Sequence, residues 1–188
     1  REVDAIIHVV RCFEDGNVVH VDGNVNPVRD KEVIDTELIL KDIDTAEKRL
    51  DKAKKAAKSG GKEELRVVDH VDKILAHLQD AKPARSCDLD DEGQAILKDM
   101  MLLTGKPILY VCNVDEASVI SGNEHSEAFK KAVAAEPAEV ILISAAIEAD
   151  IAELESYEER LEFLGEMGLQ EPGVNVLIHA AYKLLDLV

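Results

Sequence analysis

Two groups of polar residues each follow directly after a short apolar stretch of the chain, and their side chains could hydrogen-bond a ligand. The first group, Asn-Val-Asp-Glu at 113–116, follows the apolar stretch 108–112. The second, Ser-Ala-Ala at 144–146, follows the stretch 139–143. A short apolar run bounded by turn chemistry predicts a buried strand of a parallel sheet. Because ligands of open α/β sheets bind just beyond the carboxyl ends of such strands, we expect both groups to line one site.

The elements that would position these groups include a third strand. The apolar stretch 3–10 predicts it, and we expect it to be central in the sheet. A loop rich in Asp, Asn and Gly follows at 11–29; it carries His20 and has Pro27 near its end. Helices are predicted at about 89–103 and 126–136, at 156–167 with Ser156 and Glu159 in capping-box spacing, and after Pro172.

Between the strand predicted at 3–10 and the strand predicted at 108–112, the sequence predicts two long helices joined by a Gly-Gly turn. The first begins at Asp30 and the second covers about 62–81. In both, apolar residues recur at steps of four and three, which is the spacing of a coiled-coil seam. These residues are Ile39, Ile43, Ala46, Leu50, Ala53 and Ala57 in the first helix, and Val67, Val71, Ile74, Leu78 and Ala81 in the second. We therefore expect an α/β fold with a mostly parallel sheet and an inserted antiparallel α-helical coiled-coil hairpin.

The charge of the chain limits its partners. The 188 residues include 22 basic and 39 acidic side chains, a net charge of −17, and only 3% are aromatic. Such a surface repels DNA and anionic membranes, and it lacks the aromatic residues on which single strands stack. Neither a transmembrane span nor a signal peptide is recognisable. Cys12, Cys87 and Cys112 have no zinc-site spacing, which indicates reduced, buried thiols in a cytoplasmic protein.

The tip of the hairpin (residues 48–62) has the opposite charge. It carries seven Lys or Arg residues and one Asp, a local charge of +6. Two interpretations remain open. Lysine is a good helix former, so the charges could simply solvate a helix face. Alternatively, the tip contacts a phosphate backbone or an acidic surface, with the partner-binding residues Lys52, Lys54, Lys55 and Lys58.

Taken together, these segments resemble the Obg-like ATPases, the YchF family of P-loop NTPases. The resemblance covers essentially the whole chain. The matching segments are 4–14 (Asp-Ala-Ile-Ile-His-Val-Val-Arg-Cys-Phe-Glu), 34–38 (Ile-Asp-Thr-Glu-Leu), 103–107 (Leu-Thr-Gly-Lys-Pro), 113–116, 144–148 (Ser-Ala-Ala-Ile-Glu) and 171–173 (Glu-Pro-Gly). In G domains of this class, Asn-x-x-Asp after one strand and Ser-Ala-Lys after the next hold the nucleotide base.

The resemblance implies a G domain interrupted by a coiled-coil insertion, and a ribosome-associated enzyme that hydrolyses ATP in preference to GTP. Residues 1–29 and 104–188 would form the second half of the G domain, and residues 30–103 the insertion. The chain contains no GxxxxGK[ST] motif. We expect the phosphate-binding loop and the Mg²⁺ ligands before residue 1, a small β domain called TGS after residue 188, and no metal ligand within the chain.

The base-binding residues implied by the resemblance are Asn113, Val114, Glu116, Ser144, Ala145 and Ala146. In GTPases the Asp at the fourth position of the first motif accepts two hydrogen bonds from guanine, and Lys lies along the base. Here Glu116 is one methylene longer and Val114 replaces the Lys. Since a site built for the donors of guanine discriminates strongly, its loss favours adenine. Asn113 would hold the loop and Ala145 would offer its backbone, whereas Ser144 could equally be a strand-end cap.

The resemblance also assigns a role to His20. It matches a loop histidine of the family that is thought to take part in hydrolysis. A loop imidazole could orient or deprotonate the attacking water. Without the resemblance, a single histidine between valines would be read as structural.

Two other hypotheses compete with the ATPase. The chain could be a non-catalytic scaffold that presents the hairpin tip to RNA or protein. It could also be a generic flavodoxin-like α/β domain with an unrelated ligand, although that leaves the matching segments and the hairpin unexplained.

Overall fold

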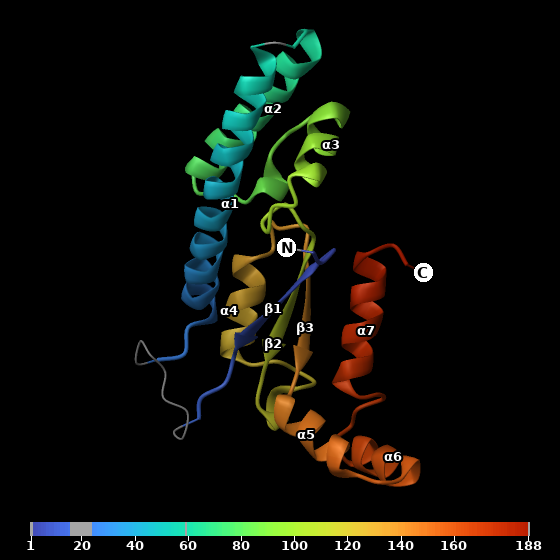
Figure 1. Cartoon of the computed structure of the whole chain (residues 1–188). Helices are drawn as coiled ribbons and strands as arrows, with labels where there is room; N and C mark the ends of the chain where they lie inside the picture. Colours follow the sequence, from blue (N-terminus) through green and yellow to red (C-terminus); the bar gives the residue numbers. More distant parts are fainter. Residues whose placement is uncertain (1, 16–23, 59, 188) are drawn as a thin grey trace. The chain divides into compact units, whose positions relative to one another are not determined.

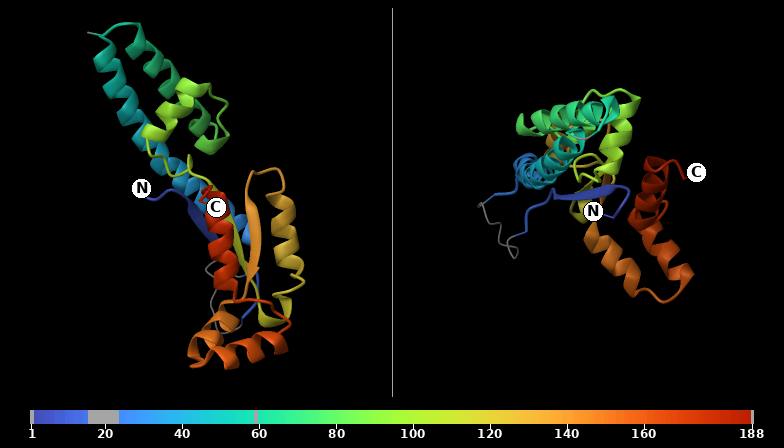
Figure 2. Two further views of the ribbon diagram at one scale, coloured as in Figure 1. Left: turned by 90° about the vertical axis from the view of Figure 1, so that its right-hand side faces the viewer. Right: turned by 45° about the horizontal axis from the view of Figure 1, so that its top comes forward.

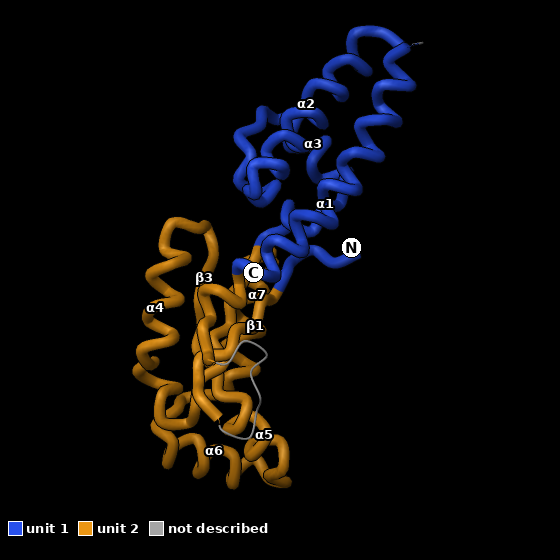
Figure 3. The backbone as a smooth tube through the Cα atoms, turned by 90° about the vertical axis from the view of Figure 1, so that its left-hand side faces the viewer, with its two compact units in different colours: residues 1–6, 32–107 blue, residues 7–31, 108–188 orange. Residues whose placement is uncertain are grey.

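The computed structural model of the chain describes residues 2–15, 24–58 and 60–187 (Figure 1). The chain divides into two compact units (Figure 3). The first contains the N-terminal residues up to 6 together with 32–107, and the second contains residues 7–31 and 108–188. The sequence-based division placed these boundaries at 29–30 and 103–104 instead.

The three predicted strands form one sheet. They are β1 (Ile6–Arg11), β2 (Ile108–Asn113) and β3 (Glu139–Ile143), in the order β1-β2-β3. Strands β2 and β3 are parallel, in a register that sets Val111 opposite Ile141. The backbone N–H groups of Ile6 and Cys12 donate to the carbonyls of Pro107 and Asn113, at 3.0 and 2.8 Å, so β1 also runs parallel to β2. The expected α/β fold with a parallel sheet is thus confirmed.

The position of β1 differs from the prediction. Among the described strands it lies at an edge of the sheet, not at its centre. His8 and Val10 are buried, whereas Ile7 and Val9 on the opposite face of the strand are 46% and 59% exposed. An apolar sequence alone does not distinguish a central strand from an edge strand with one uncovered face.

Helices cover both faces of β2, which is buried along most of its length (Figure 2). On one face, the ring of Tyr110 lies 5.7 Å from that of His8 and 5.2 Å from that of Phe129, which belongs to α4 (Glu124–Ala132). On the other, α7 (Gly173–Leu184) packs Ala180 against β2 and β3. The remaining helices of this unit are α5 (Ala145–Glu153), α6 (Tyr157–Glu166) and the 3₁₀ turn η2 (Glu116–Ser118).

The other unit is helical. It contains most of α1 (Pro27–Ala57), then α2 (Lys62–Gln79), the 3₁₀ turn η1 (Ala84–Ser86) and α3 (Asp91–Asp99). Seam residues of both long helices share one core with Leu97 of α3. Ala81 does not belong to the seam, because α2 ends at Gln79 and Ala81 is exposed with a φ of 57°.

Three helices begin at other residues than the sequence predicted, among them α4, which begins at Glu124 instead of about residue 126. Helix α1 starts at Pro27, not at Asp30, because proline is tolerated in a first turn and the side-chain oxygen of Asn26 accepts the N–H of Arg29 at 3.0 Å. Helix α3 is shorter than expected. The carboxylate of Asp90 accepts the N–H of Gly93 at 2.8 Å and so fixes its start.

Candidate functional site

The polar groups predicted from the sequence meet at the carboxyl ends of β2 and β3. They line a cavity of about 230 Å³ within the second unit. Its lining residues are Phe13, Glu14, Asp15, Asn113, Val114, Asp115, Glu116, Ala145 and Ala146. Five of the six residues proposed to bind the base are therefore brought together here.

Asn113 connects the end of β2, through hydrogen bonds, to the residues that follow both neighbouring strands. Its side-chain oxygen accepts the backbone N–H of Ala145, the first residue of α5, at 3.0 Å. Its carbonyl accepts the N–H of Cys12 at 2.8 Å. In addition, the N–H of Val114 donates to the carbonyl of Ile143 at 2.9 Å. The floor of the cavity is thus cross-linked by hydrogen bonds.

The two carboxylates that follow Val114 have different surroundings. Asp115 caps the 3₁₀ turn η2, where its carboxylate accepts the N–H of Ser118 at 3.0 Å. Glu116 is exposed at the rim of the cavity. Asp115 is therefore used to shape the loop, and the carboxylate available to a ligand is that of Glu116.

Ser144 is the predicted base-binding residue outside the cavity lining. It is the N-cap residue of α5 and is 1% exposed, yet its side chain forms no capping hydrogen bond. Within the described part of the chain, its buried hydroxyl has no hydrogen-bond partner. Burying a hydroxyl without a hydrogen-bond partner costs free energy. The side chain of Ser144 therefore does not act as a strand-end cap.

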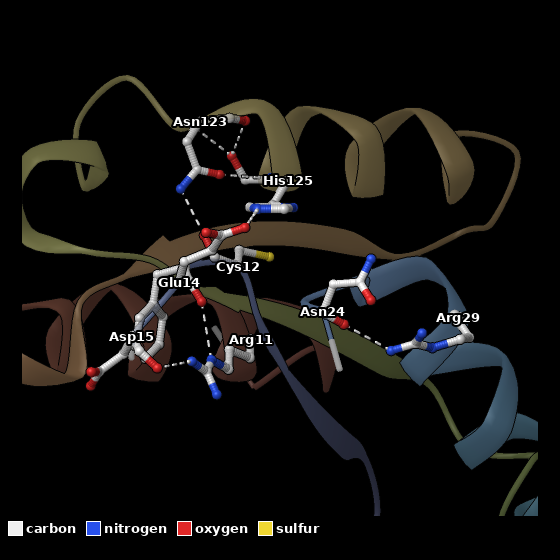
Figure 4. A network of polar contacts seen from close by, with 10 residues as sticks. Arg11, Cys12, Glu14, Asp15, Asn24, Arg29, Asn123 and His125 are labelled. Atoms are coloured by element: carbon white, nitrogen blue, oxygen red, sulfur yellow. Dashed lines mark hydrogen bonds and ion pairs between the residues drawn. The ribbon is translucent and has the colours of Figure 1, made fainter. Parts of the chain in front are cut away.

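Residues 13–15 form the side of the cavity that sequence reasoning did not assign. Figure 4 shows Glu14 and Asp15 beside Arg11 and Asn123, whose side chains hydrogen-bond to the backbone of this part of the chain. Arg11 positions residues 13–15: its Nε donates to the carbonyl of Phe13 at 3.0 Å, and its guanidinium lies 4.9 Å from the centre of the Phe13 ring. From α4, the side chain of Asn123 donates to the carbonyl of Cys12 at 2.7 Å. The signal was present in the sequence, because residues 13–15 also follow directly after a predicted strand.

Two buried cysteines lie beneath the site. Cys112 directly precedes Asn113, and Cys12 directly precedes Phe13. A hydrogen bond between the two thiols raises the pKa of Cys12 and lowers that of Cys112, while burial disfavours the thiolate of both. All three cysteines are buried, as the sequence predicted, and none of them forms a disulfide in the structure.

Of the remaining predicted site residues, His20 lies outside the described part of the chain. Lys52, Lys54 and Lys55 are exposed on α1, and Lys58 is exposed directly after its end. No cluster of three or more His, Cys, Asp or Glu side chains suited to a metal occurs in residues 2–15, 24–58 and 60–187. In the same residues, every helix is too short or too polar to span a lipid bilayer.

A parallel sheet covered by helices on both faces, with a cavity at the carboxyl ends of two adjacent strands, defines an open α/β fold of the kind that binds ligands at this edge of the sheet. The solved structure titled "Structure of the Schizosaccharomyces pombe YchF GTPase" matches 97% of this chain and 50% of its own chain, with a TM-score of 0.85 and 28% identity. Proteins named "Ribosome-binding ATPase YchF" from Bacillus subtilis and Escherichia coli O157:H7 are 47% and 45% identical over the whole chain.

These similarities confirm the resemblance to the YchF family that the motifs indicated. The chain spans about half the length of the curated relatives that it matches, 51% in both cases. No protein-family model matches the chain.

Proposed function

We propose that this chain provides the base-binding part of the nucleotide site in a ribosome-associated ATPase of the Obg-like type. The cavity carries the proposal, because it joins the Asn113–Glu116 loop to the start of α5 at the point where such a fold binds its ligand. The names of the relatives from Bacillus subtilis and Escherichia coli, both ribosome-binding ATPases, support it.

The chemistry of the cavity favours adenine over guanine. Val114 is 2% exposed and offers an apolar surface where a guanine site has lysine. Phe13 adds an aromatic face on which a base can stack. The longer side chain of Glu116 does not reproduce the paired acceptor geometry that guanine requires. The preference is open to test, since the Schizosaccharomyces pombe relative is described as a GTPase.

Hydrolysis would require groups beyond the base site. In this proposal the phosphates and the Mg²⁺ of bound ATP are held by residues outside the chain, because the chain contains no GxxxxGK[ST] motif. Magnesium would neutralise charge on the phosphates. His20 would act as the general base or orient the attacking water.

The presence of two compact units supports a division of labour within the chain. Residues 1–29 and 104–188 would belong to the G domain, and residues 30–103 to an insertion whose basic tip contacts the ribosome. That partner implies a cytoplasmic location. The alternative is a non-catalytic scaffold, in which the exposed lysines Lys52, Lys54, Lys55 and Lys58 bind RNA or protein without a nucleotide-dependent step.

The proposal is tested by calorimetric titration of ATP and GTP into a polypeptide of the relatives' length that carries this sequence. We expect tighter binding of ATP, and a loss of about tenfold on Asn113→Ala, which corresponds to about 1.4 kcal/mol for one hydrogen bond. Ser121→Ala, at an exposed serine outside the cavity, serves as the control. Equal affinity for both nucleotides, or no effect of Asn113→Ala, would contradict the proposed base site.

A further inference from the structure

A second cavity of the sheet-containing unit lies between α5, α6 and the start of α7. This groove has a volume of about 610 Å³ and shares no lining residue with the base site. Its apolar lining consists of Ile151, Ala152, Tyr157, Leu161, Leu164 and Val174. The walls are fixed by their own small core, in which Ile147 and Ile151 of α5 pack with Leu164 of α6. The groove is therefore a formed feature of the described structure.

Large apolar side chains stand exposed along the groove. Tyr157 is 70% exposed, and Leu161 and Val174 are each 48% exposed. Tyr157 and Leu161 are four residues apart on α6, so they lie on the same side of that helix. Leu164 is only 4% exposed and forms the floor between them and α5. Contiguous exposed apolar groups of this kind mark interaction sites.

The segment that forms most of the groove is strongly acidic. Residues 148–171 contain nine Asp or Glu side chains and a single basic residue, Arg160. The guanidinium of Arg160 is held by the carbonyl of Leu154, at 2.8 and 3.1 Å. Glu158 and Glu162 follow Tyr157 and Leu161 directly in sequence and are exposed. Neither carboxylate lines the groove, but both flank the exposed apolar side chains of α6 on the solvent side.

We propose that this groove docks a basic amphipathic helix of a protein partner. Its apolar residues would occupy the groove between α5 and α6, and its Lys or Arg residues would face Glu158 and Glu162. A groove between helices suits an α-helical ligand. The carboxylates would steer a basic segment toward the groove and would repel nucleic acid and anionic lipid. This surface is independent of the proposed base site and of the hairpin tip.

The test uses the whole chain and a fluorescent synthetic peptide of Leu and Lys, with Leu on one helical face, of about fourteen residues or roughly four turns. Fluorescence anisotropy measures its affinity. We expect Leu161→Ser and Tyr157→Ser each to weaken binding by about tenfold, as the loss of a buried apolar anchor does. The double variant Glu158→Lys/Glu162→Lys should weaken binding and reduce its salt dependence.

Matched controls lie on the helical unit. Leu65→Ser removes a leucine that is 54% exposed, and Glu37→Lys/Glu47→Lys reverses two exposed carboxylates of α1. Neither should change the affinity. Equal binding of a Leu/Glu peptide, or equal loss in the controls, would overturn the proposal. So would self-association in sedimentation equilibrium that Leu161→Ser abolishes, because the groove would then be an interface between copies of the chain.

Discussion

The side-chain oxygen of Asn113 accepts a hydrogen bond from the backbone N–H of Ala145 at 3.0 Å, and this bond joins the ends of β2 and β3 across the floor of the cavity. The loop after β2 and the first turn of α5 are therefore fixed to each other before any ligand binds. A site organised in this way does not have to be ordered by its ligand, which favours affinity. Asn113 acts here as a positioning residue, as the sequence suggested.

Restoring the guanine-specific residues should reverse the base preference. Val114→Lys combined with Glu116→Asp places a cation along the base and shortens the carboxylate to the length found in GTPases. We expect the ratio of GTP to ATP affinity to rise by at least about a hundredfold, because paired hydrogen bonds to a base discriminate strongly. Competition binding with labelled ATP measures it. The control is Glu124→Asp, an exposed glutamate on α4; an unchanged ratio in the double variant would remove both residues from base selection.

The sequence predicted the strands and the polar groups at their ends better than it predicted their surroundings. Strand β3 was predicted at residues 139–143 and β2 to within one residue, because apolar runs between turn residues are unambiguous. The contribution of Phe13 to the cavity was missed, since the segment that carries it is held in part by a distant contact, from the side chain of Asn123 to the carbonyl of Cys12. The edge position of β1 was missed for the same reason: neighbours of a strand are set by tertiary pairing and not by its own residues.

His20→Ala should slow hydrolysis and leave ATP binding intact, if this histidine serves the attacking water. In a polypeptide of the relatives' length, we expect the turnover number to fall by about a hundredfold or more, the contribution typical of a general base. The dissociation constant of ATP should change by less than about twofold. His179→Ala, at an exposed histidine of α7, is the matched control. Unchanged turnover would remove His20 from the mechanism.

Charge reversal at the hairpin tip should weaken binding to ribosomes. Changing Lys52, Lys54, Lys55 and Lys58 to Glu removes up to four phosphate contacts, and each lost contact reduces the slope of log affinity against log salt by about 1. Co-sedimentation with ribosomes at several salt concentrations measures both effects. Changing Lys82, Lys98, Lys131 and Lys183 to Glu, at exposed lysines outside the tip, makes the same change in net charge and is the control. Identical sedimentation of all variants would show that the lysine charges of the tip only keep the helix surface hydrated.

Asp42 should be essential for the stability of the helical unit. This fully buried carboxylate on α1 accepts the N–H groups of Leu103 and Thr104, at 2.9 and 2.6 Å, and the Thr104 hydroxyl at 2.8 Å. Asp42→Ala leaves these buried donors without an acceptor and should lower the free energy of unfolding by roughly 3 kcal/mol, measured by urea denaturation. Asp44→Ala, two residues away, breaks an exposed ion pair with Lys48 and should cost less than about 1 kcal/mol. Similar losses in both would contradict the proposed anchoring.

Acid should loosen the first turn of α6 through Glu159. The backbone N–H of Ser156 donates to the carboxylate of Glu159 at 3.0 Å, and the Ser156 hydroxyl accepts the N–H of Glu159 at 3.1 Å. Hydrogen bonds to the carboxylate, first from the backbone N–H of Ser156 and then from the Ser156 hydroxyl, lower the pKa of Glu159 in the folded chain. A carboxylate with a lowered pKa contributes stability at neutral pH, and that contribution is lost as the pH falls through the folded-state pKa.

Carbon-13 NMR titration of the Glu159 carboxyl measures this directly. We expect a lower pKa in the folded chain than in the same chain unfolded in urea, and faster amide exchange of the first turn of α6 once the carboxyl is protonated. Glu159→Gln should remove the pH dependence of that exchange and leave the rest of the chain unchanged, while Glu166→Gln at the other end of α6 should retain it. A folded-state pKa equal to or above the unfolded one would show that the capping box seen here does not persist in solution. In that event the first turn of α6 would be held by the packing of Leu164 with its apolar neighbours. This turn carries Tyr157 and borders the groove between α5, α6 and the start of α7.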